Sequence, residues 1–347
     1  MRWKAVSVVA AAVLASMGVA LAGAPDASLI GPMRATLDLV LPYYPPSARA
    51  AGLGTSTVAL EGIDSNNPAA LGFFEGHDVM LDYSRIDFNR GPDLDIGRTH
   101  VVFPMPMMGG TMKLMAFGVH TRHADVSKMM GMEASVSATE FGFAYGRKIP
   151  IPEEAGELAI GAAGYPYDPA RLTLDVPGGG TFARSKAMSQ LGSIRAGVMY
   201  KPIDKITFGA DFTHLKDAAW AKYPGAGIPH RSTSNYFVNL WTVGMSVRPD
   251  ERTVVTVQGI TGRANGEGVN MAYSRFSAGI ERQIPIGEAF ELALRAGVLG
   301  NQMTWGFGAR LPEGWRVDYA LLPMYGQGVE SAFGRGPFHM LGVGKSF

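Results

Sequence analysis

The second half of the chain alternates apolar and polar residues with a period of two. In the stretch FELALRAGV, Phe290, Leu292 and Leu294 fall on one face, while Glu291 and Arg295 fall on the other. The same alternation recurs in TFGADFTH, RFSAGIER, MTWGFGARL and WRVDYALL. A period of two indicates β-strands, because successive side chains of a strand point to opposite faces of the sheet. These segments are long enough to cross a bilayer as tilted strands.

The connections between these segments are short and long in turn. Short turns occur at LPEG, RQIPIGEA, RPDER, KPIDK, RKIPIPEEAGE and PMMGG, with longer and more irregular stretches between them. The two longest cover residues 165–186 and 214–236. This asymmetry is typical of an outer-membrane barrel, with short periplasmic turns and long extracellular loops, whereas a soluble β-sandwich has no reason to keep it. We therefore predict an all-β, transmembrane antiparallel β-barrel of about fourteen strands over residues 78–347.

The composition agrees with a membrane barrel and disfavours several other classes. The chain has 45 Gly, 18% charged residues and a formal net charge of +1, so it carries no basic surplus for binding nucleic acid. Although 47% of the residues are hydrophobic, no apolar stretch after Leu21 approaches the length of a spanning helix. The absence of cysteine excludes disulfides, thiolate chemistry and a cysteine zinc site.

Both ends of the chain suggest export to an outer membrane. Arg2 and Lys4 precede an apolar stretch that ends in Ala-Leu-Ala, so we predict a signal peptide over residues 1–22, with a membrane anchor as the alternative. The chain ends in GVGKSF, and its terminal Phe347 resembles the signal that outer-membrane barrels present to their assembly machinery. Lys345 departs from that pattern, in which a second apolar or aromatic residue is usual.

Residues 23–77 precede the first strand and do not alternate. They have small-residue and short helical character, and they are too apolar to hang free in the periplasm. A closed barrel of the predicted size has room for such a segment in its lumen. We therefore predict an N-terminal plug, or hatch, inside the barrel.

The stretch ARAAGLGTSTVALEGIDSNNPAALGFF resembles the hatch of the long-chain fatty acid and hydrophobic-compound transporter family, the FadL type. Its two matching parts comprise Ala51, Gly52, Gly54, Val58 and Ala59, and then Asn67, Pro68, Ala69 and Leu71. The resemblance implies a fourteen-stranded barrel with the hatch in its lumen and with its largest extracellular loops between strands five and six and strands seven and eight. Residues 165–186 and 214–236 fall at those places.

The resemblance also implies passive uptake of an apolar molecule through a loop groove, a luminal pocket and a shift of the hatch. Candidate ligand-lining residues are Phe73, Phe74, Met112, Met115, Leu172, Leu174, Phe182 and Trp220. Alternatively, the two Phe residues pin the hatch to the wall, and the methionines face lipid or pack in loops. Arg195, Arg295 and Arg310 on the predicted inner face either bind an anionic head group or pair with acidic residues to stiffen the wall. Pro104 and Pro106 predict an interrupted second strand and a possible lateral opening.

Other functions stay open or find no support. Some relatives of this family serve protein secretion, and a diffusion porin is a further alternative. No motif for catalysis or dinucleotide binding is present, and His120 and His123, three apart, would point to opposite faces of a strand, so we expect no enzyme, metal site or cofactor. The expected partners are outer-membrane lipid and lipopolysaccharide, a hydrophobic small-molecule ligand and the barrel assembly machinery, with the protein itself a monomer.

Overall fold

The structure is a computed structural model that describes residues 45–86, 94–121, 133–167, 171–176, 180–223, 228–266, 269–287, 290–322 and 337–347. The predicted signal peptide and the first part of the predicted hatch, residues 1–44, lie outside these ranges, as does His123. Within the described residues, no helix is both long enough and apolar enough to span a membrane.

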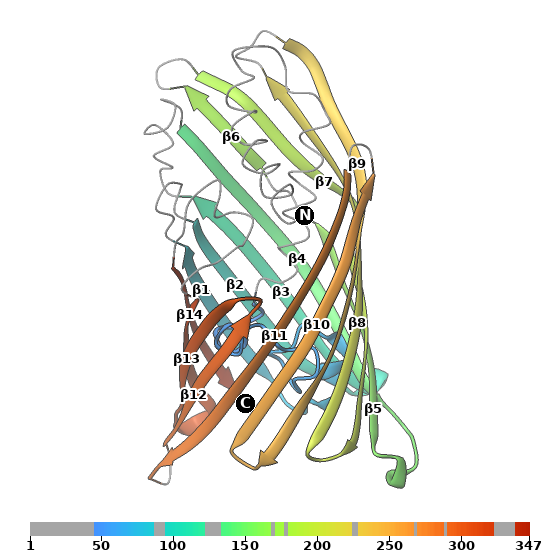
Figure 1. Ribbon diagram of the computed structural model, residues 1–347, viewed down its shortest axis with the longest axis vertical. Coiled ribbons are helices and arrows are strands. Elements are labelled where there is room, and N and C mark those ends of the chain that lie inside the picture. The colour runs from blue at the N-terminus through green and yellow to red at the C-terminus, as the bar shows by residue number, and fades with distance from the viewer. Residues whose placement is uncertain are drawn as a thin grey trace.

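Fifteen β-strands and a few short helical turns make up the described part of the chain (Figure 1). The strands are β1 (Asp78–Ile86), β2 (Leu94–Met105), β3 (Gly110–Thr121), β4 (Glu133–Ile149), β5 (Glu157–Tyr167), β6 (Arg171–Val176), β7 (Gly180–Ile203), β8 (Ile206–Tyr223), β9 (Ile228–Asp250), β10 (Thr253–Gly266), β11 (Val269–Ile286), β12 (Phe290–Leu299), β13 (Gln302–Arg310), β14 (Trp315–Leu322) and β15 (Phe338–Ser346). The helical pieces are α3 (Ala48–Gly52), η3 (Pro68–Phe73), η4 (Pro106–Met108), η5 (Glu153–Ala155) and η7 (Pro312–Gly314).

The strands form one antiparallel sheet that closes on itself. β1 pairs with both β15 and β2, and β3 pairs with both β2 and β4, which completes the ring. β5 and β6 both pair with β4 on one side and β7 on the other, so β6 continues the line of β5. The predicted barrel of fourteen strands is therefore confirmed for the described part of the chain.

The wall of the barrel is uneven in height. β7 has 24 residues and β9 has 23, whereas β14 has 8. The stretches 165–186 and 214–236, predicted as irregular loops, lie mostly in β5 to β7 and in β8 and β9. For the described residues of these stretches that prediction is wrong, because they continue the ladders of the wall, which satisfies their main-chain hydrogen bonds without an irregular loop.

The outer face of the barrel is apolar and the inner face is polar. Leu294 on β12 is 47% exposed, whereas the next residue, Arg295, is 7% exposed and points into the lumen. Leu81, Trp241 and Phe276 are likewise large, apolar and exposed on the outside. The faces predicted for FELALRAGV are thus confirmed, and the apolar exterior is that of a barrel that spans a membrane.

The short turns gather at one end of the barrel, at the bottom of Figure 1. They include η4, η5 and η7, and by the usual asymmetry of outer-membrane barrels this is the periplasmic end. Pro106 begins η4, and Pro104 pairs with Thr111 in a β2–β3 ladder that is unbroken as far as Met105. The predicted interruption of the second strand is therefore wrong, because the prolines lie at its end and in the turn that follows.

Candidate functional site

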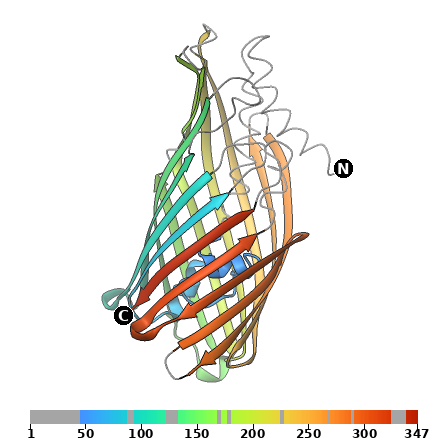
Figure 2. The same cartoon turned by 90° about the vertical axis from the view of Figure 1, so that its left-hand side faces the viewer.

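Residues 45–77, here called the luminal segment, lie inside the barrel (Figure 2, blue). The sequence ARAAG forms α3 because the Ser47 hydroxyl caps it, accepting a hydrogen bond from the Ala50 amide at 3.2 Å. η3 begins in the same way, with the Asn67 side chain accepting from the Ala69 amide at 3.0 Å and Pro68 in the first position. The two short helices hold the segment in a compact shape against the wall.

An ion-pair network joins α3 to the strands beside it. Arg49 donates to the two carboxylate oxygens of Glu281 on β11, at 2.9 and 2.7 Å. Arg295 on β12 donates to the same carboxylate at 2.6 Å and pairs with Asp318 on β14 at 2.7 Å. Arg49 also donates to Asp64 at 3.3 Å, so one guanidinium joins α3 both to the wall and to a later part of the luminal segment.

The negative charge on Asp64 is stabilised by the guanidinium groups of Arg316 and Arg49. Burial by itself raises the pKa of the Asp64 carboxyl, but Arg316 and Arg49 together hold that pKa well below its usual range. The same balance acts on Arg49, where burial lowers the pKa of the guanidinium, and Glu281, Asp64 and Asp318 together raise that pKa above its ordinary value. Both groups are therefore charged inside the lumen.

The Asn67 amide attaches the other end of the segment. Its nitrogen lies 3.0 Å from the Val58 carbonyl oxygen, 3.0 Å from that of Val198 on β7 and 3.2 Å from that of Ala210 on β8. Val198 and Ala210 face each other in the β7–β8 ladder, so one side chain contacts two adjacent strands. Asn67 is thus both the cap of η3 and a link to the wall.

Gln258 on β10 holds the middle of the segment in a similar way. Its side-chain oxygen accepts from the amides of Thr57 and Val58 at 2.9 and 3.0 Å, and its nitrogen donates to the Thr55 carbonyl at 2.7 Å. Ser246 on β9 donates to the Ala59 carbonyl at 2.9 Å. The main chain of the segment, which forms no sheet of its own, therefore finds its hydrogen-bond partners in the wall.

A belt of glycines lines the wall where the segment touches it. A Cβ atom at any of these positions would meet an atom of the segment, and they are Gly146, Gly161, Gly197, Gly209, Gly244, Gly279, Gly297 and Gly306. Many are cross-strand partners, for instance Gly161 with Gly146 and with Gly197. Their missing side chains let the segment lie directly against the strands.

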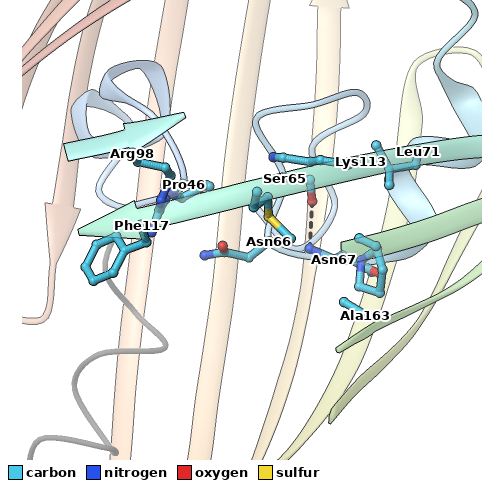
Figure 3. A pocket seen from close by; sticks show the side chains of 12 residues that line it. Pro46, Ser65, Asn66, Asn67, Leu71, Arg98, Lys113, Phe117 and Ala163 are labelled. Atoms are coloured by element: carbon cyan, nitrogen blue, oxygen red, sulfur yellow. Dashed lines mark hydrogen bonds between the residues drawn. The ribbon is translucent and has the colours of Figure 1, made fainter. Parts of the chain in front are cut away.

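A cavity of about 60 Å³ lies between the luminal segment and strands β2 to β5 (Figure 3). It is lined by Pro46, Ser65, Asn66, Asn67, Pro68, Leu71, Arg98, Lys113, Met115, Phe117, Ala144 and Ala163. The lining combines apolar side chains with two cations. Arg98 donates to the Pro45 carbonyl at 2.7 Å and lies 5.4 Å from the centre of the Phe117 ring. Lys113 donates to the Ile63 carbonyl at 2.8 Å.

Solved structures show which known fold has this architecture. No family model and no curated protein matches the sequence. The toluene transporter TbuX from Ralstonia pickettii superposes with a TM-score of 0.53 at 13% identity, over 88% of this chain and 98% of that one. A FadL homologue from Pseudomonas aeruginosa gives a TM-score of 0.51 at 10% identity, over 87% of this chain and 98% of that one.

The chain has the FadL-type transporter fold. The predicted resemblance is thus confirmed at the level of the fold. Both similar structures carry the names of transporters or their homologues, and neither is named as an enzyme. Within this FadL-type fold, the predicted hatch residues Asn67, Pro68, Ala69 and Leu71 all lie in or beside η3, buried against the wall.

The predicted ligand-lining residues separate into distinct groups. Met115 lines the cavity, but Met112 faces outward, as the buried Thr111 and Lys113 on either side of it show. That expectation for Met112 is wrong, because residues three apart on a strand point to opposite faces. Phe73 and Phe74 are half-buried and pack against apolar clusters between the segment and the wall, outside the cavity lining. The side chains of Leu172, Leu174, Phe182 and Trp220 lie outside the described part of the structure.

The three predicted head-group arginines are held by protein groups. Arg195 donates to Thr213 and to the Asn66 carbonyl, both at 2.8 Å, and Arg295 belongs to the Glu281 network. Arg310 lies at the periplasmic end of β13, where its exposed side chain is 3.5 Å from Glu291. None of them lines the cavity.

Lys113 and Arg98 are the cations of the cavity that sequence reasoning missed. The stretch TMKLMAFGV contains the signal, since its alternation places Lys113, Met115 and Phe117 on one face. Lys113 is 5% exposed, and within the described residues its ammonium has the Ile63 carbonyl as partner and no carboxylate within 4.0 Å.

Replacing Asn67 tests how the FadL-type barrel holds its luminal segment. Asn67→Ala should lower the free energy of unfolding by about 1–3 kcal/mol, because buried carbonyl groups lose their donor. Denaturant unfolding in detergent, followed by tryptophan fluorescence, measures the change. Asn66→Ala is the matched control, since the hydrogen bonds of Asn66 use its main chain. Equal stability of both variants would contradict the role given to the Asn67 amide.

Proposed function

We propose that the protein is an outer-membrane channel for the passive uptake of apolar small molecules, with the luminal segment as its hatch. The observation that carries the proposal is the partly apolar cavity between that segment and β2–β5. The fold supports only the general class of this function, an uptake channel for apolar compounds, because the similar structures include a toluene transporter. The apolar exterior supports a location in the outer membrane.

The size of the cavity supports movement of the hatch. Its volume of about 60 Å³ holds a few water molecules, whereas a dry cavity that binds benzene has a volume of about 150 Å³. An apolar solute therefore needs a wider space than this state offers. Because Pro46, Asn67 and Leu71 of the luminal segment form one side of the cavity, a shift of the segment away from β2–β5 would widen it.

The bound solute is the most direct evidence for this function. Protein purified gently in detergent and analysed by native mass spectrometry should retain an apolar molecule at near one per barrel. Each CH₂ group that leaves water for an apolar site contributes about 0.8 kcal/mol, which opposes release of such a solute into water during purification. A barrel that is always empty, and that co-purifies with other envelope proteins, would instead support a role in secretion.

We further propose that Lys113 discriminates among solutes by their head groups. A buried ammonium without a carboxylate partner is costly, and an anionic head group in the cavity would supply one. Lys113→Met should therefore reduce uptake of a fatty acid while leaving uptake of a neutral hydrocarbon of the same chain length unchanged. Initial uptake rates of the two radiolabelled solutes, measured in the same cells, give the ratio of fatty acid uptake to hydrocarbon uptake.

Two controls make the Lys113 experiment specific. Lys205→Met removes an exposed cation in the turn between β7 and β8, and it should leave the ratio unchanged. Lys113→Gln keeps a donor near the Ile63 carbonyl but removes the charge, and it should behave like Lys113→Met. Parallel loss of both solutes in Lys113→Met would show a structural role instead.

A further inference from the structure

The turn between β2 and β3 differs from the other periplasmic turns in its lack of charge. The sequence VVFPMPMMGGTM, residues 101–112, contains no ionisable side chain. At its tip, in η4, Met107 is fully exposed at 101% and Met108 is half-exposed. Such a turn would leave two large apolar side chains in water if it projected into the periplasm.

The neighbouring turns show what a water-facing turn of this barrel looks like. Glu153 and Glu154 lie in η5, Asp204 and Lys205 join β7 to β8, and Glu313 lies in η7. The Asp204 side chain is 97% exposed. Each of these turns presents charge to the solvent, so the apolar tip of the β2–β3 turn is a property of that turn and not of the periplasmic end as a whole.

Tyr145 indicates the depth of the β2–β3 turn in the membrane. It follows the exposed Phe141 and Phe143 on the outer face of β4, and its hydroxyl donates to the Met108 carbonyl at 2.6 Å. Tyrosines on the outer face of a barrel mark the level of the lipid head groups. The turn is therefore tied to the interface, and its apolar surface is continuous with the lipid-facing Val101 and Leu114.

We propose that the β2–β3 turn is a membrane anchor that inserts Met107 and Met108 into the periplasmic leaflet, at the boundary between head groups and acyl chains. The partner is the phospholipid of that leaflet, since the apolar turn extends the lipid-facing surface of the wall and carries no charge to recognise a polar partner. Methionine suits this place because its flexible, polarisable side chain adapts to disordered chains. Figure 2 shows the turn at the foot of the barrel, close to the C-terminus. The anchor is independent of which solute the barrel carries.

A single-cysteine experiment tests the anchor in the whole protein. The chain has no cysteine, so Met107→Cys can be labelled at one place with an environment-sensitive NBD fluorophore. Asp204→Cys, in the water-facing β7–β8 turn, is the matched control. Both variants are reconstituted into phospholipid vesicles that contain either plain lipid or lipid with a nitroxide near the head group, with iodide supplied to both sides of the membrane.

The anchor predicts opposite quenching at the two positions. The probe at position 107 should emit at shorter wavelength, be quenched strongly by the nitroxide lipid and resist iodide, whereas the probe at position 204 should be quenched by iodide. Equal access of iodide to both probes would overturn the proposal. Access of iodide in vesicles, combined with protection by a crosslinked protein in cell envelopes, would also overturn it and identify a protein partner instead.

Discussion

Glu281→Gln should loosen the luminal segment and raise the ion conductance of the barrel. The Glu281 carboxylate is 1% exposed and neutralises the guanidinium groups of Arg49 and Arg295. Removing its charge takes away the carboxylate that the two cations share and leaves Arg49 with Asp64 and Arg295 with Asp318. Breaking a buried pair costs about 3–5 kcal/mol, and these remaining partners place the expected cost at the lower end of that range. Since Arg49 belongs to the segment and Glu281 to the wall, the cost falls on the contact between them. Single-channel recording in planar bilayers measures the expected increase in conductance.

A second carboxylate provides the control for this variant. Glu291→Gln weakens a pair with Arg310 that lies 3.5 Å apart and is partly exposed at the barrel end, where such pairs contribute about 0–1 kcal/mol. Its conductance should match that of the unaltered protein, and so should its resistance to proteolysis within residues 45–77. A wild-type barrel that already conducts like an open pore would contradict the hatch and support a diffusion porin.

Gly197→Val should displace the luminal segment by steric overlap instead of charge. A Cβ atom at Gly197 would overlap the Asn67 side-chain oxygen, so the larger side chain drives the Asn67 amide away from the carbonyls that it contacts on β7 and β8. Overpacking of this kind costs about 1–3 kcal/mol, to which the lost hydrogen bonds add. We expect a lower denaturant midpoint together with increased conductance.

A control substitution shows whether the effect of Gly197→Val comes from overlap with Asn67 or from placing a valine in any strand. Gly259→Val on β10 is the matched control, because a Cβ atom there has no heavy atom within 4 Å. In an Asn67→Ala background, Gly197→Val should cost less than in the unaltered protein, since the overlapping oxygen is gone. Additive effects of the two substitutions would show that the glycine does not act through Asn67.

The barrel could be predicted from the sequence because its signal is local and repeated. Each strand carries its own alternation, as in Phe290, Leu292 and Leu294, and the bilayer reverses the usual faces without changing the period. The extracellular ends were harder to predict. Glycine and proline near residues 165–186 suggest loops, yet pairing with β4 and β7 extends the strands, and such pairing is a tertiary effect that outweighs local propensity.

The site was less predictable because its contacts join distant residues. Arg49 and Glu281 are 232 positions apart, and no local pattern connects them. The inner-face arginines were visible from alternation, but whether they were free or paired depended on the path of the luminal segment. Met112 and Lys113, in contrast, could have been assigned correctly from the sequence. The period of two in their strand places Lys113 on the inner face with Met115 and places Met112 on the outer face.

A reversible disulfide tests most directly whether the luminal segment must move for uptake. A Cβ atom at Gly342 on β15 would lie 3.6 Å from the Ala48 Cβ, within the span of about 3.5–4.5 Å that a disulfide needs. A Cβ atom at Gly342 would also lie 2.6 Å from the ends of the Asp82 and Met80 side chains, which must shift to admit it. With that shift, Ala48→Cys combined with Gly342→Cys fixes α3 to the wall, close to Pro46 in the cavity lining. Uptake of radiolabelled oleate and toluene is compared in oxidised and reduced cells, with each single-cysteine variant as control. The hatch predicts that oxidation stops uptake of the transported solute and that reduction restores it, in the double variant alone. Uptake that continues at the same rate with the disulfide formed would contradict the account.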